Sequence, residues 1–100
     1  MDVEVVDQPD QGRYVALLDG EQAGFVSYRR DGDRIVFLHT EVDDRFEGRG
    51  VGSTLVRRTL EEARATELTV VPRCPFYRAW LDRHPGYSDL LDTGAGGRRG

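Results

Sequence analysis

The most informative absences in this 100-residue sequence are lysine, which does not occur, and cysteine, which occurs once. Without lysine the chain cannot form a P-loop, whose last glycine is followed by a lysine that reaches the nucleotide phosphates. With one cysteine no internal disulfide can form, and a structural zinc site of the usual kind lacks ligands. We therefore expect neither a P-loop protein nor a disulfide scaffold, and no metal site.

The sequence also has little that would direct it to a membrane or to nucleic acid. Residues 1–10 contain neither the basic nor the apolar segment of a signal peptide. No apolar run approaches the ~18 residues that a membrane-spanning helix needs. The net charge is −4, whereas nucleic-acid-binding proteins usually carry a basic face. We expect a cytoplasmic protein with no nucleic-acid or membrane partner.

The hydrophobic pattern predicts an α/β (α+β) fold, with two helices and a mixed, mostly antiparallel sheet. One domain is expected over residues 1–91, because a chain of this length usually forms one domain. Residues 92–100 contain four glycines and are expected to be disordered. The Asp-Gly pairs at 19–20 and 31–32 predict hairpins. The expected strands are 3–6, 13–18, 23–30, 35–42, 68–71 and 87–91, and the expected helices are 51–65 and one that begins at Pro75.

A glycine-rich turn lies between the strand expected at 35–42 and the helix expected at 51–65. Gly48, Gly50 and Gly52 are each two residues apart. The first N–H groups of a helix have no internal partner and the helix dipole adds positive potential, so a turn of this kind can bind a phosphate. An ordinary strand-to-helix turn would need only one glycine. The dinucleotide fingerprint G-x-G-x-x-G fits poorly, because no third glycine follows at the required spacing.

The spacing that does match is R-x-x-G-x-G, formed by the six residues from Arg45 to Gly50. It resembles the pyrophosphate loop of the Gcn5-related N-acetyltransferases, which bind acetyl-CoA. The segments HTEV before the loop and VVPRCPFYRAWLDRHPGY after the helix resemble the small single-domain branch of that superfamily. The resemblance covers most of residues 23–87.

The resemblance implies a reduced acyl-CoA-binding fold, with acetyl-CoA as the acyl donor and an unknown amine as the acceptor. Backbone N–H groups from about Phe46 to Ser53 would hold the pyrophosphate, and Arg45 and Arg49 would add positive charge. The candidate cofactor-binding residues are Val42, Arg45, Phe46, Glu47, Gly48, Arg49, Gly50, Val51, Gly52 and Ser53.

His39 and Glu41 are candidates for a general base. They lie two residues apart on one strand and should therefore share a face, which we expect to be the face of Ile35 and Phe37. Either side chain, directly or through water, could take the proton of the attacking amine. The alternatives are a hydrogen-bonded core histidine and a solvated glutamate.

Cys74 and Tyr77 are candidates for the remaining chemistry. Cys74 precedes Pro75 at the expected start of a helix and follows Arg73, and both features favour the thiolate. The resemblance favours a role as acyl acceptor or as the acid that protonates the CoA thiolate, and the alternative is an inert buried cysteine. Tyr77 is a second candidate acid, or an aromatic residue packed under the loop. Phe76 and Trp80 are most simply core residues.

Compared with the larger family, the sequence lacks the two helices that usually separate the first two strands and shape the acceptor site. The predicted function is acetyl transfer from acetyl-CoA to an amine, with Glu41 or His39 as base and Cys74 or Tyr77 as acid. The alternative is a module that binds CoA or acetyl-CoA without transfer, as a sensor or a subunit. Acyl relay through Cys74 is a third possibility.

Overall fold

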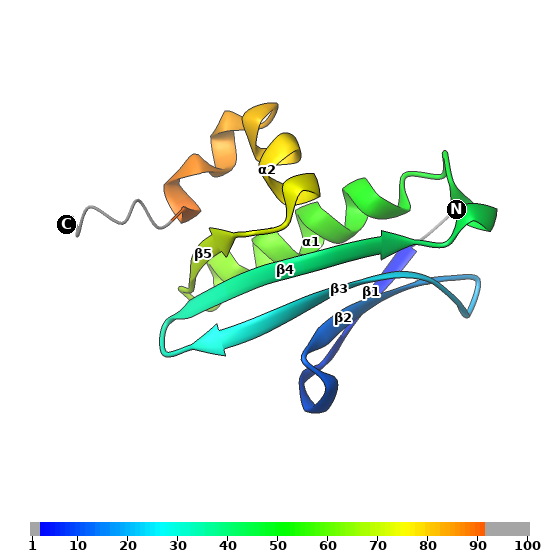
Figure 1. Cartoon of the computed structure of the whole chain (residues 1–100), viewed down its shortest axis with the longest axis horizontal. Coiled ribbons are helices and arrows are strands. Elements are labelled where there is room, and N and C mark those ends of the chain that lie inside the picture. The colour runs from blue at the N-terminus through cyan, green and yellow to red at the C-terminus, as the bar shows by residue number, and fades with distance from the viewer. Residues whose placement is uncertain (1–2, 92–100) are drawn as a thin grey trace.

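A computed structural model describes residues 3–91 and shows one five-stranded sheet with the order β1-β2-β3-β4-β5. It confirms the expected α/β class with a mostly antiparallel sheet (Figure 1). The expectation for residues 92–100 lies outside the described residues, and the domain bounds 1–91 stay a prediction. The strands are β1 (Val3–Gln8), β2 (Arg13–Leu18), β3 (Glu21–Asp31), β4 (Arg34–Val42) and β5 (Thr69–Pro72).

Strands β1 to β4 form an antiparallel meander with short connections. Between β2 and β3, Asp19 has φ 53° and Gly20 has φ 81°, the pair of left-handed residues that two-residue hairpins favour. Between β1 and β2, a 3-10 helix η1 (Pro9–Gln11) is followed by Gly12 at φ 64°. The hairpin expected at 19–20 is therefore confirmed, as is the one at 31–32, where β3 and β4 pair antiparallel. Only η1 and Gly12 separate the first two strands.

The helices α1 (Val51–Ala65) and α2 (Pro75–Asp82) pack against the same side of the sheet. Helix α1 carries the chain from β4 to β5, which pair in parallel (Figure 1). The Tyr77 ring of α2 stacks on Phe37 of β4 with centroids 4.4 Å apart. The Tyr77 hydroxyl lies 2.6 Å from Thr59 Oγ1 of α1. We call this side of the sheet the helix face and the other side the open face.

Strand β4 contains a β-bulge at Leu38. On β3, the neighbouring residues Ser27 and Tyr28 pair with His39 and Phe37 respectively, so Leu38 is the extra residue on β4. A bulge places two residues opposite one and so interrupts the strict alternation of side chains along the strand. The faces of the residues after Leu38 therefore cannot be read from the residues before it.

The bulge also ends the buried part of β4. The start of this strand is covered on both faces, since the consecutive residues Ile35, Val36 and Phe37 are all buried. Leu38, in contrast, is 39% exposed. Both faces of β4 are thus covered only before the bulge, and the carboxyl half of the strand is left accessible for other contacts.

After α2 the chain forms a 3-10 helix, η3 (Pro85–Leu90). The expected strand at 87–91 was therefore wrong, and within residues 3–91 only Leu91 makes an isolated parallel bridge, to Val70. Proline is well suited to the first position of a helical turn because its φ is already helical. Pro85 occupies that position and favours a helical turn over a strand.

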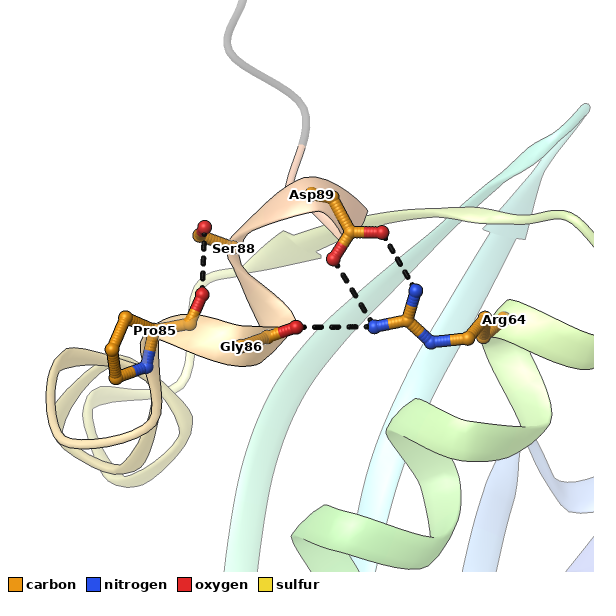
Figure 2. Close-up of polar contacts among 5 residues, drawn as sticks. All are labelled: Arg64, Pro85, Gly86, Ser88 and Asp89. Atoms are coloured by element: carbon orange, nitrogen blue, oxygen red, sulfur yellow. Dashed lines mark hydrogen bonds and ion pairs between the residues drawn. The ribbon is translucent and has the colours of Figure 1, made fainter.

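Contacts with α1 hold η3 in place. The Arg64 guanidinium donates to the two carboxylate oxygens of Asp89 at 2.6 and 3.1 Å and to the Gly86 carbonyl oxygen at 3.3 Å (Figure 2). The Tyr87 hydroxyl donates to Glu61 of α1 at 3.1 Å. These contacts join residues more than 20 positions apart, which a local reading of the sequence does not detect.

Candidate functional site

The amino end of α1 supplies free N–H groups to the glycine-rich loop. Gly50 is the N-cap at φ 76°, a left-handed conformation that glycine adopts without strain. The first helical bond runs from the Thr54 N–H to the Gly50 carbonyl. The N–H groups of Val51, Gly52 and Ser53 precede it and have no carbonyl within the helix to accept them. No acidic side chain lies in this first turn, so the helix end can bind an anion.

A cleft of about 370 Å³ lies against this loop. Eight of the ten predicted cofactor-binding residues line it, while Arg45 and Arg49 do not. Two residues of the α2 region that were not predicted as site residues, Phe76 and Arg83, complete it. The full lining is Val42, Phe46, Glu47, Gly48, Gly50, Val51, Gly52, Ser53, Phe76 and Arg83.

Helix α2 forms the wall of the cleft opposite the loop. A Cβ atom on Gly52 would lie 2.8 Å from Cζ of Phe76, so glycine is needed for the close approach of the two helices. Phe76 is 42% exposed, so its assignment to the core was wrong. Trp80 is buried as expected, and its indole N–H donates to Ser53 Oγ at 3.2 Å. Phe76 belongs to no phosphate-binding motif, so no sequence pattern indicates that it borders the cleft.

The Arg45 side chain is hydrogen-bonded to the neighbouring Asp43. Its Nε and Nη2 donate to the carboxylate of Asp43, each at 3.3 Å, and its backbone N–H donates to the same carboxylate at 2.9 Å. These bonds lower the pKa of the Asp43 carboxyl and raise the pKa of Arg45. The carboxylate offsets much of the charge that Arg45 was expected to offer a phosphate.

Strands β4 and β5 separate at the bulge. Their pairing ends at Phe37 and Pro72. The N–H groups of Arg73 and Cys74 both donate to the Phe37 carbonyl oxygen at 3.0 Å, which turns the chain away from β4. Among the described residues, no strand pairs with residues 38–42 on that side. Backbone groups of β4 are thereby left accessible next to the cleft.

Cys74 lies at this separation point, on the helix face. It is the N-cap of α2, as its position before Pro75 predicted. Its Sγ atom lies 3.2 Å from Thr40 Oγ1, and the residue is 3% exposed. Thr40 was not predicted as a site residue, because only the bulge turns it toward Cys74.

His39 and Glu41 lie together on the open face. His39 Nε2 and Glu41 Oε2 are 2.9 Å apart, which confirms that the two side chains share a face. The expectation that this is the face of Ile35 and Phe37 was wrong, because the bulge interrupts the alternation between them. The two side chains are 59% and 62% exposed. They form an accessible imidazole–carboxylate pair rather than a buried one.

A smaller hollow of about 170 Å³ lies beside Glu41. Val42 lines both this hollow and the larger cleft, so the two spaces are neighbours across β4. The lining contains two carboxylates, those of Glu41 and Asp43. The full lining is Gln22, Ala23, Gly24, Phe25, Glu41, Val42 and Asp43.

Tyr77 is not brought together with the other candidates. The residue is 0% exposed, and its hydroxyl lies 2.6 Å from Thr59 Oγ1 in the core. Burial raises the pKa of the Tyr77 hydroxyl well above its ordinary value, although the bond to Thr59 acts in the opposite direction. A phenol held in this way is poorly placed to reach the cleft. The geometry therefore favours the alternative in which Tyr77 is a packed aromatic residue rather than the acid.

Comparison with known proteins identifies the family. A profile described as GCN5-related N-acetyl-transferase matches residues 13–90, which include β2 to β5 and both helices. The chain belongs to the GCN5-related N-acetyltransferase family. This confirms the resemblance carried by the glycine-rich loop.

The chain also resembles individual known proteins. Rat N-acetylaspartate synthetase is 33% identical over an alignment of 87 positions, which covers 76% of this chain and 29% of the rat protein. The chain thus spans less than a third of that curated relative. A GCN5-like protein from Staphylococcus aureus shares the fold, with a TM-score of 0.68 and 24% identity over 95% of this chain and 96% of its own.

Two further solved structures resemble this chain with lower TM-scores. Ard1 from Thermoplasma volcanium has a TM-score of 0.53 and 27% identity, covering 61% of this chain and 43% of its own. Ribosomal-protein-alanine N-acetyltransferase from Brucella melitensis biovar Abortus has a TM-score of 0.57 and 18% identity, covering 88% and 68%. Within residues 3–91, no group of three or more His, Cys, Asp or Glu side chains could hold a metal ion. No helix in that range is long and apolar enough to cross a membrane.

Proposed function

We propose that this N-acetyltransferase binds acetyl-CoA in the cleft at α1 and transfers the acetyl group to an amine. The observation that carries the proposal is the amino end of α1. Three N–H groups without a helical acceptor, those of Val51, Gly52 and Ser53, border a cleft of about 370 Å³. Helix ends of this kind bind phosphates through N–H groups and the helix dipole. The family membership supports the same reading.

The separation of β4 and β5 leaves space for the pantetheine arm of acetyl-CoA. With the pyrophosphate at the loop, the pantetheine arm would extend along residues 38–42 of β4, which have no strand partner on that side among the described residues. An extended chain with amide groups can bond to such an unpaired strand. The thioester would then lie near the bulge and near Cys74, where the two strands part.

The direct reaction needs a base on the acceptor side. The amine nitrogen attacks the thioester carbonyl carbon, the C–S bond breaks, and CoA leaves as a thiolate that takes up a proton. The amine proton passes to the pair formed by Glu41 and His39, which are 2.9 Å apart and accessible. The Glu41 carboxylate lines the smaller hollow and suits an acceptor that is cationic before it loses that proton, whereas the Asp43 carboxylate in the same lining is paired with Arg45.

Cys74 has two possible roles in this scheme. In the first, its thiol donates the proton that the leaving CoA thiolate needs. In the second, its sulfur attacks the thioester to give an acetyl-cysteine, which the amine then attacks. Its place at the strand separation, 3.2 Å from the Thr40 hydroxyl, supports a position near the thioester. Tyr77 has no role in the scheme because its hydroxyl is bonded within the core.

The test is release of CoA thiol from acetyl-CoA in the presence of a panel of polyamines, amino acids and basic peptides. Glu41→Gln should reduce the release by about 100-fold if Glu41 acts as the base. Asp89→Asn is the matched control, because the Asp89 carboxylate is equally exposed at 62% but lies at η3. It should leave the release unchanged.

Two other outcomes would change the assignment. Tight binding of acetyl-CoA without release for any amine would favour the non-catalytic CoA-binding module. An added acetyl mass on Cys74 that hydroxylamine removes, together with inactivity of Cys74→Ala, would establish the relay in place of direct transfer.

A further inference from the structure

The face of α2 that borders the cleft carries three regularly spaced residues. Phe76, Trp80 and Arg83 follow one another by four and three residues, which places them on one side of a helix. Phe76 lies against Gly52 and Trp80 donates to Ser53 Oγ, while Arg83 lines the cleft beyond them. The second helix therefore presents an aromatic residue and a cation to whatever the α1 loop binds.

The order of these residues along α2 matches the order of groups in CoA. Cys74, at the amino end, lies where the thioester is expected. Trp80 contacts Ser53, at the loop proposed for the pyrophosphate. Arg83 follows Trp80 by three residues, which places it about 4.5 Å further from Cys74 along the helix axis. In CoA the group that follows the pyrophosphate, on the side away from the thiol, is the ribose with its 3′-phosphate.

The Arg83 guanidinium is available for such a phosphate. The residue is exposed, and no hydrogen bond or ion pair ties its side chain to another of residues 3–91. Of the described residues that line the cleft, it is also the only basic one. The acidic residue of the same lining, Glu47, belongs to the loop. A guanidinium can donate two parallel bonds to phosphate oxygens, which gives both affinity and orientation.

We propose, building on the proposed acetyl-CoA site, that Arg83 binds the 3′-phosphate of CoA and makes the protein discriminate CoA from 3′-dephospho-CoA. The two ligands share thiol, pantetheine, pyrophosphate and adenosine and differ only in this phosphate. Isothermal titration with each ligand therefore isolates the contact. The wild-type protein should bind CoA about tenfold more tightly, as expected for one charge-assisted contact at an accessible site.

Three variants define the role of the side chain. Arg83→Gln should bind 3′-dephospho-CoA as the wild type does, and should bind CoA no more tightly than that. Arg83→Lys keeps a charge without the planar pair of donors and should retain part of the preference. Arg78→Gln is the matched control, because Arg78 lies on the same helix but lines a separate hollow with Pro72 and Leu91. It should keep the full preference.

The outcomes separate this inference from the proposed function. Equal wild-type affinity for both ligands would overturn the role of Arg83 and leave the acetyl-CoA site standing. An equal loss of affinity for CoA and for 3′-dephospho-CoA in Arg83→Gln would also overturn the role of Arg83, since the side chain would then serve the pyrophosphate or the fold. Binding of neither ligand by the wild type would overturn the proposed function together with the inference.

Discussion

The two faces of the sheet differ most along the second half of β4. On the helix face Thr40 contacts Cys74 near the cleft at α1, in surroundings fixed by two packed helices. On the open face His39 and Glu41 are accessible and hydrogen-bond to each other, and the Phe25 ring lies beside His39. One extra residue, Leu38, produces this division. Under the proposed function, this one strand would contact the acyl donor on one side and carry the base on the other.

The sharpest test of this contrast compares two neighbouring residues of β4. Phe37 is 0% exposed and stacks on Tyr77, whereas Leu38 at the bulge is 39% exposed. Phe37→Ala should lower the free energy of unfolding by about 3–5 kcal/mol, because it leaves a cavity between sheet and helices. Leu38→Ala should lower it by less than about 1 kcal/mol. Urea unfolding measures both, and similar losses would show that β4 is not divided at the bulge.

A second comparison separates the stability cost of replacing a left-handed glycine from the effect of the replacement on CoA binding. Gly50 in the loop has φ 76° and Gly20 in the β2–β3 turn has φ 81°, and an added Cβ would meet nothing within 4 Å at either position. Each substitution to alanine should therefore cost a similar amount of stability, about 1 kcal/mol.

Only Gly50→Ala should also weaken CoA binding, by about tenfold, because its methyl group occupies space that the phosphates need. Isothermal titration of each variant with CoA measures this difference in affinity. Equal CoA affinity in Gly50→Ala and Gly20→Ala would remove the loop from the binding site.

The smallest expected effect concerns two carboxylates that are equally exposed. Asp89 accepts two bonds from Arg64, while Glu41 on the open face meets only the imidazole of His39. Asp89→Asn should lower Tm by about 2–4 °C at pH 7, as expected for a well-aligned surface pair. Glu41→Gln should change Tm by less than this.

The Asp89 contribution should also depend on pH. Arg64 lowers the pKa of the Asp89 carboxyl in the folded protein. The stabilisation is therefore present above about pH 4, where the unfolded carboxyl is ionised, and is lost as the pH falls through the lower folded pKa. Thermal melts of wild type and Asp89→Asn should converge in acid, and a constant difference down to pH 2 would contradict the pairing.

Much of this arrangement could be predicted from sequence because the signals are local. The Asp-Gly pairs, the apolar stripe of α1 and the glycine spacing after β4 each lie within a few residues, and the structure confirms the elements that they indicate. The face of His39 and Glu41 could not be predicted, since a bulge has no fixed sequence signature. Phe76 and Arg83 were missed for a related reason. They reach the cleft only through the packing of α2 on α1, which joins residues more than 20 positions apart.

Trp80 also gives the protein an optical property. It is the only tryptophan in the sequence, and its indole lies between two different neighbours. On one side its N–H is bonded to Ser53 at the glycine-rich loop, and on the other its ring stacks on His84 with centroids 3.7 Å apart. Emission excited at the indole therefore comes from one known position at the edge of the cleft. Unlabelled protein can report a change at Ser53 by the colour and intensity of its own fluorescence.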